Sequence, residues 1–162
     1  MSLTTDLIGL LILAYFIFRQ VTPRPPSRTR FYVLPIVALL IAYHDFPRPT
    51  VPPGQLIDAL VSVTPSLPFG VMQAYFTTLY QSQGRWLLRG DWRYVLSWLA
   101  LFALHIATTV LLRPSAGHAV VMVSWIAALE VAVVWGVRSL TLHLRYPELR
   151  SILTESPRIS RS

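Results

Sequence analysis

Two titratable side chains lie inside long apolar stretches, where an ionised group is costly. Glu130 stands in VSWIAALEVAVVWGV, and His105 lies near the middle of YVLSWLALFALHIATTV. Since an ionised carboxylate at the centre of a bilayer costs about 2.5 to 3.5 kcal/mol on insertion scales, Glu130 should face protein or water. It could relay a proton or cation, or contact an arginine of a partner subunit. The alternative is a protonated carboxyl group hydrogen-bonded to a neighbouring helix through Ser97, Thr108 or Thr109.

Two histidines on different apolar runs raise the question of a b-type haem, which two imidazoles can ligate. At 1.5 Å per residue, His44 lies roughly 4 Å and His105 roughly 11 Å inside the predicted outer membrane boundary. Axial ligands should approach the iron at nearly one level, so we predict no haem. The chain has no cysteine, which excludes disulfides, iron–sulfur clusters and thiolate zinc sites.

A further group of potential ligands gathers near the same predicted boundary: His44, Asp45, Asp58 and His118. Two imidazoles and two carboxylates could hold a divalent metal, or serve as acid and base at the lipid interface. Polar residues cost little at helix ends, however, and the spacing within each helix matches no ligand motif. We therefore expect ordinary helix-end residues there, and predict no catalytic residue and no bound cofactor.

The composition indicates that these residues belong to an integral membrane protein. Of 162 residues, 54% are hydrophobic and 13% charged, and the mean hydropathy is +0.53. The apolar blocks approach the length needed to cross a hydrocarbon core roughly 30 Å thick. We predict an all-α bundle of five transmembrane helices forming a domain over residues 1–145, with a partly disordered cytoplasmic tail, 146–162. The predicted spans are about 3–18, 31–46, 55–80, 94–112 and 118–138.

The basic residues indicate an orientation. All 14 are arginines, giving a net charge of +7, and they concentrate in three segments, 19–30, 81–93 and the chain after residue 137. Because basic loops stay in the cytoplasm, we predict an inner-membrane, multi-pass protein with its N-terminus outside and its C-terminus inside. The arginines are scattered between apolar runs, so we expect contacts with anionic lipid headgroups and none with nucleic acid.

Two prolines interrupt the third predicted span, in TPSLPFG. Pro65 and Pro68 cannot donate the amide hydrogen bonds that a continuous helix requires at those positions. We predict a kink or break at 64–70, with Thr64 capping the inner half-helix and the face of the deprived carbonyls pointing into the bundle. The break could merely shape packing, or form a hinge or polar niche for a ligand.

Short polar and turn-forming residues divide the segment after the third predicted span into smaller elements. TTLYQ and RWLLR flank a turn-like SQG, which predicts a small hairpin; the alternative is an irregular loop at the membrane interface. Asp91 precedes the next apolar run and should cap its helix by accepting amide hydrogen bonds. Near the C-terminus, Pro147 should break the continuation of the last helix.

The stretch from Phe69 to Ile106 resembles bacterial membrane proteins of the CcdC-like family. The residues that carry the resemblance are Gln73, Ala74, Leu79, Tyr80, Gly84, Trp86 and Arg89, together with the spacing of Pro35 and Asp45. The resemblance covers about residues 20–112. It implies a multi-spanning membrane protein, and it transfers no catalytic residue.

Three functions fit these candidate residues and the predicted membrane topology. The first is a non-enzymatic subunit or assembly factor of a larger bacterial membrane complex, binding other subunits or copies of itself. The second is a small oligomeric transporter or channel that uses Glu130 and the interrupted third span. The third is a lipid-modifying enzyme that uses the outer histidines and aspartates. The small polar inventory favours the first, without enzymatic activity.

Overall fold

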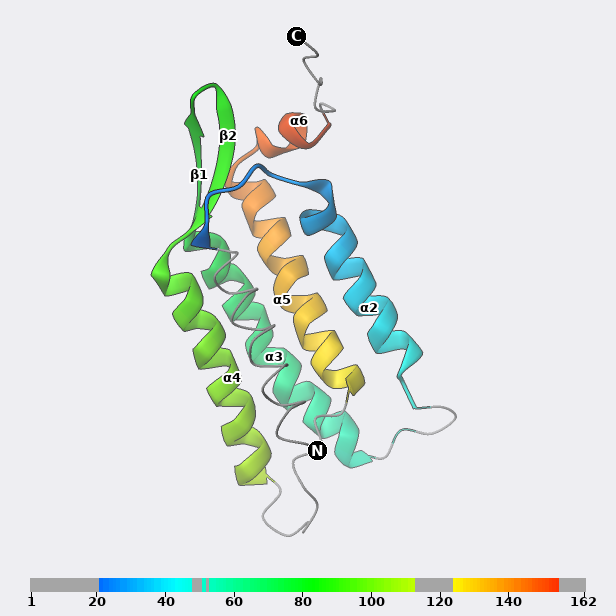
Figure 1. The fold of residues 1–162 in the computed structure, drawn as a ribbon. Coiled ribbons are helices and arrows are strands. Elements are labelled where there is room, and N and C mark those ends of the chain that lie inside the picture. The colour runs from blue at the N-terminus through cyan, green and yellow to red at the C-terminus, as the bar shows by residue number, and fades with distance from the viewer. Residues whose placement is uncertain (1–20, 48–50, 52, 113–123, 155–162) are drawn as a thin grey trace, which may run out of the picture.

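The computed structural model describes residues 21–47, 51, 53–112 and 124–154. In these ranges the chain forms a short π-helical turn, η1 (Thr29–Val33), helices α2 (Leu34–His44) and α3 (Pro53–Tyr75), strands β1 (Thr77–Ser82) and β2 (Arg85–Gly90), and helices α4 (Trp92–Leu112), α5 (Ser124–Arg145) and α6 (Leu149–Thr154). Helices α2, α3, α4 and α5 lie side by side, and β1, β2 and α6 gather at one end (Figure 1).

Helices α3 and α5 form the centre of the helical group. α4 packs against α3 on one side and α2 against α5 on the other. The chain therefore places α2 and α4 on opposite flanks (Figure 1). The arginines of the described residues lie on η1, the preceding segment, the hairpin, the start of α4, the later turns of α5 and α6. All these segments meet at the same end of the molecule, which we call the basic end.

A row of small residues lets α3 approach α5 closely. Ser62, Ser66, Gly70 and Ala74 recur every four residues, so they share one face of the helix. Ser66 and Ala74 are fully buried. A Cβ added to Gly70 would lie 2.9 Å from the backbone oxygen of Val134 on α5. Small residues at this spacing are typical of tightly packed helices in membranes, because they allow the two backbones to come together.

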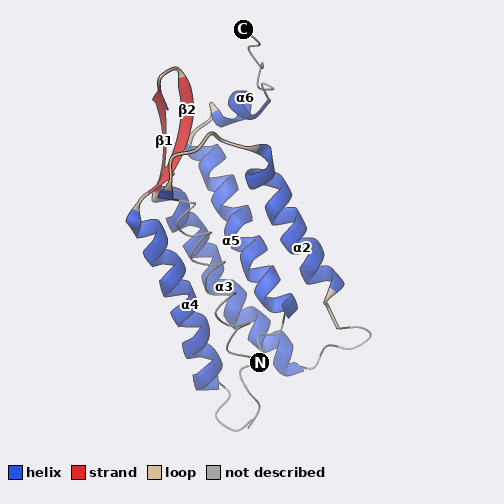
Figure 2. Ribbon diagram, in the orientation of Figure 1, coloured by secondary structure: helices blue, strands red, loops and turns tan. Residues whose placement is uncertain are grey.

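The hairpin forms as the sequence predicts. β1 and β2 pair antiparallel, with Ser82 opposite Arg85. The two loop residues, Gln83 and Gly84, have φ angles of 51° and 73°, as a two-residue type I′ turn requires. Figure 2 shows the hairpin projecting beyond the ends of the helices. The Asp91 cap is also confirmed, since its Oδ1 accepts the amide of Trp92 at 2.6 Å.

Arginine side chains tie the pieces of the basic end together. Arg145 donates to the carbonyl of Tyr75 at 3.0 Å, and so satisfies the end of α3. Arg28 donates to the carbonyls of Leu153 and Thr154 at the end of α6. Phe31, Ala74, Leu142, Leu149 and Leu153 form the apolar cluster beneath these contacts. As predicted, α5 stops just before Pro147. The sequence did not predict α6, which packs back on this cluster through Leu149 and Leu153.

The predicted all-α bundle of five membrane spans is wrong. Among the described residues, only Trp125–Arg145 is both long and apolar enough to cross a membrane; the apolar helices Thr29–His44 and Trp92–Ala107 are shorter. The predicted third span, 55–80, ends in a strand, because residues 77–80 belong to β1. The first predicted span, 3–18, lies outside the described residues. Apolar composition alone overestimated the number of helices with membrane-spanning length.

Of the predicted kink or break at 64–70, the break is wrong, because α3 continues through Pro65 and Pro68; the kink stays a prediction. Hydroxyl groups bond to carbonyls within this stretch: Thr64 Oγ1 donates to the Leu60 carbonyl at 2.7 Å, and Ser66 Oγ to the Ser62 carbonyl at 3.2 Å. Thr64 therefore bonds back along one continuous helix and does not cap a second one. The small-residue face of the same helix packs against α5.

Candidate functional sites

A buried acid–base pair joins α4 to α5. His105 Nδ1 lies 2.9 Å from Glu130 Oε1. The two side chains are 13% and 10% exposed, so both are largely removed from the surface. Ser62 on α3 lines the same small cavity as these two side chains. The prediction that Glu130 faces another helix is confirmed, and three helices meet at one polar contact.

Helical periodicity explains why these side chains point inward. Ile126, Glu130 and Val134 are all buried and lie four residues apart on one face of α5. On α4, His105 follows the buried Leu101 by one turn, on the face that packs against α3. The expected partners of Glu130 were Ser97, Thr108 and Thr109. The Ser97 hydroxyl instead donates to the Tyr94 carbonyl at 2.7 Å, and the side chains of Thr108 and Thr109 lie outside the described part of the chain.

The space around the pair is very small. A cavity of about 10 Å³ is lined by Val61, Ser62, Pro65, Leu101, Leu104, His105 and Glu130. That volume is near the lower limit for a single water molecule. Pro65 therefore borders the polar contact, while Pro68 is exposed. The arrangement can hold or exchange a proton between two side chains, but it cannot admit an organic substrate.

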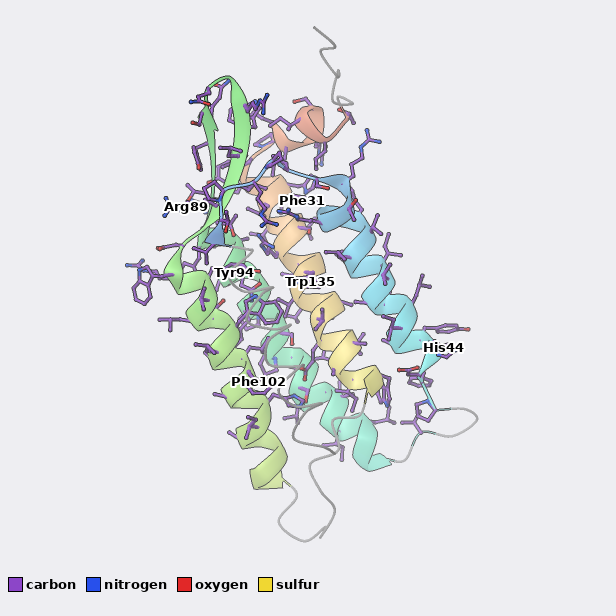
Figure 3. The ribbon with its side chains drawn as sticks, viewed as in Figure 1. Phe31, His44, Arg89, Tyr94, Phe102 and Trp135 are labelled. Atoms are coloured by element: carbon purple, nitrogen blue, oxygen red, sulfur yellow. The ribbon has the colours of Figure 1, made fainter. Side chains whose placement is uncertain are left out.

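The two histidines considered as haem ligands do not lie together. His44 lies at the end of α2 (Figure 3) and its Nδ1 is 3.0 Å from Asp45 Oδ1. His105 belongs to α4, on the opposite flank, and pairs with Glu130. The other two residues of the outer group cannot be placed, because the Asp58 side chain and the whole of His118 lie outside the described residues. Within those residues no three potential metal ligands come together.

A larger cavity opens at the basic end, with a volume of about 370 Å³. The segment before η1, η1 itself, the base of the hairpin and α5 surround it. Its lining residues are Thr22, Arg24, Pro25, Pro26, Ser27, Thr29, Arg30, Phe31, Leu34, Thr77, Leu88, Gly90, Trp135, Arg138, Ser139 and Leu142. The sequence did not predict this site. Its arginines were recognised only as signals of orientation, because the lining comes from segments more than a hundred residues apart.

Comparison with protein-family models, curated proteins and solved structures found no match to this chain. The resemblance to the CcdC-like family therefore stays a prediction. The functional argument rests on the geometry of the described residues.

Proposed function

We propose that this protein is a membrane-embedded, non-enzymatic subunit or assembly factor of a larger membrane complex. The observation that carries the proposal is the set of large apolar side chains on the outer faces of the helices. These apolar groups surround a core that is itself mainly apolar and also holds several polar side chains.

The outer faces of the helices are rich in large apolar side chains. Among those exposed by more than a third are Ile36, Leu40 and Tyr43 on α2, Leu60 and Leu67 on α3, Leu99 and Phe102 on α4, and Leu140 and Leu144 on α5. Water-soluble monomers rarely expose contiguous apolar patches of this kind. On α2 the apolar residues surround the helix rather than forming a stripe, as expected for a helix in contact with both protein and lipid.

The interior shows the complementary feature. Ser66, Gln73, Thr77, Ser97 and Glu130 are all buried. Two of these residues bond to another element: Glu130 to His105 of α4, and Thr77 to Arg138 of α5. Polar contacts between helices stabilise packing in lipid, where burial of apolar side chains gives little stabilisation. The apolar length of Trp125–Arg145 and the apolar outer faces of the neighbouring helices support contact of α5 and its neighbours with a bilayer. The basic end would then lie at an anionic membrane surface.

The geometry favours a structural role over catalysis. The buried pair of His105 and Glu130 borders a space of about 10 Å³, so its groups cannot reach a substrate. The exposed His44 and Asp45 contact each other. An accessory subunit needs only a stable shape and a surface for its partner, which the hairpin and the apolar outer faces supply.

Two measurements test this proposal. The full chain should remain with membranes after an alkaline carbonate wash, and release into the supernatant would contradict its insertion. Isolation in a mild detergent should then bring down a second protein, or a second copy, in fixed stoichiometry. The membranes should be solubilised without removing their lipids and measured by native mass spectrometry. If only the single chain is found, the subunit role is contradicted.

A second function, proton or cation transfer, is favoured by the buried pair itself. An acid and an imidazole in contact between helices, with a serine and a proline beside them, are the components of a proton relay. Liposomes containing the purified protein should show a proton flux that Glu130→Gln abolishes. Glu148→Gln is the matched control, because Glu148 is exposed in the turn before α6. Equal flux in liposomes with and without protein would exclude this function.

A further inference from the structure

We propose that the cavity at the basic end binds the phosphate group of an anionic phospholipid. The preference for a lipid over a soluble phosphate rests on the proposed membrane location; the preference for phosphate rests on the cavity alone.

The charge of the lining selects an anion. Arg24, Arg30 and Arg138 contribute to the wall, and the described lining residues include no aspartate or glutamate. Hydroxyl groups stand beside the arginines, on Thr22, Ser27, Thr29 and Ser139. The Thr77 hydroxyl also lines the cavity, but it donates to the Gln73 carbonyl. Planar guanidinium groups match the geometry of phosphate oxygens and can bind two of them at once. Hydroxyl groups donate further hydrogen bonds to the same oxygens.

The cavity wall is held in place by contacts that do not depend on a ligand. The backbone of Arg24 pairs with Leu88 of β2 in both directions, at 3.0 and 2.7 Å. The guanidinium of Arg138 lies 4.9 Å from the centre of the Tyr94 ring, and its Nη2 is 3.4 Å from Thr77 Oγ1. Because these groups are already ordered, binding would cost less conformational entropy than the closure of mobile side chains.

The remaining lining is apolar and suits the other half of a lipid. Phe31, Leu34, Trp135 and Leu142 line the cavity. Figure 3 shows Trp135 on α5, nearer the middle of the helical group than Phe31. Polar and apolar walls therefore meet in one cavity, close to helices whose outer faces are apolar. A volume of about 370 Å³ is within the range of small-molecule sites, enough for a headgroup and the first part of its acyl chains.

The test uses the full chain, purified in an uncharged detergent, with phosphatidylglycerol and inorganic phosphate as probes. We expect saturable binding of one phosphatidylglycerol by native mass spectrometry or by thermal stabilisation. The double variant Arg24→Gln, Arg30→Gln should weaken that binding by about tenfold or more, which is about 1.4 kcal/mol or more, because it removes charge-assisted hydrogen bonds to the phosphate oxygens. Arg85→Gln, at the hairpin tip and outside the lining, should bind as the parent does.

Each outcome decides the inference. Competition by millimolar inorganic phosphate supports a phosphate site that accepts either source, whereas binding of the lipid without competition supports a site that also requires the acyl chains. Absence of saturable lipid binding, or equal binding by the double variant with an unchanged unfolding temperature, overturns the inference. A protein that resists the carbonate wash but binds no lipid contradicts this site alone. A protein that binds phosphate but is released by the wash contradicts the membrane proposal alone.

Discussion

Replacing Gly70 by alanine tests the close approach of α3 and α5. The added Cβ would lie 2.9 Å from the Val134 carbonyl oxygen, 2.9 Å from Val137 Cβ and 3.1 Å from Val137 Cγ1, whereas ordinary contacts begin at 3.4 Å. Relief of the shortest contacts requires a shift of about 0.5 Å (3.4 − 2.9). The carbonyl belongs to the backbone, so it cannot rotate away and the helices must separate.

The magnitude follows from the contacts that this separation weakens. A gap of about 0.5 to 1 Å forfeits roughly a quarter to a half of the dispersion energy of each affected contact, and overpacking of a core typically costs about 1 to 3 kcal/mol. Gly136→Ala is the matched control, because Gly136 is also helical and its added Cβ meets nothing within 4 Å. The gain in helix propensity, about 1 kcal/mol, is common to both variants and cancels in their difference.

The assay is thermal unfolding followed by circular dichroism at 222 nm, with parent and variants in the same detergent. Gly70→Ala should unfold at a temperature lower than Gly136→Ala by about 2 to 12 °C, taking about 2 to 4 °C per kcal/mol for a chain of this size. Equal unfolding temperatures for the two variants would refute the close approach, because the packing cost would then be absent.

Glu130→Gln should fold and insert like the parent, because its amide can still bond to His105. Glu130→Lys should lower the free energy of unfolding, measured in detergent, by about 3 kcal/mol or more. Full stability with lysine would mean that this position meets water. A double-mutant cycle with His105→Ala and Glu130→Ala should give a coupling free energy of about 0.5 to 3 kcal/mol, and additive effects would show that the pair contributes nothing. Gly84→Val should accelerate amide hydrogen exchange in the hairpin by roughly five- to thirtyfold, because a side chain in the left-handed region costs about 1 to 2 kcal/mol. A Cβ at this position meets no atom within 4 Å, so a steric clash would not explain the effect. Unchanged exchange would contradict the turn geometry. Arg145→Ala should destabilise the protein by about 0.3 to 1 kcal/mol, because it loses the bonds to the last carbonyls of α3. Arg150 is exposed, so Arg150→Ala is the control and should have little effect. Equal unfolding temperatures for the two variants would refute the capping role.

Features set by neighbouring residues could be predicted from the sequence. The hairpin followed from SQG, because a tight turn needs two consecutive residues in the left-handed region, as Gln83 and Gly84 are. The cap by Asp91 and the stop before Pro147 depend on bonds within a few residues of each position. The inward orientation of Glu130 followed from the cost of leaving a polar group in hydrocarbon.

Features set by distant residues required the tertiary structure. Apolar runs did not fix helix length, since residues 77–80 joined a strand and α3 continued through Pro65 and Pro68. The partner of Glu130 depended on the rotation of α4 about its own axis, which brings His105 toward α5 across 25 residues of sequence. The basic cavity depended on bringing the segment before η1 against the hairpin and α5. Sequence patterns determine which face of an element is polar, but only the packing of whole elements determines which polar faces meet.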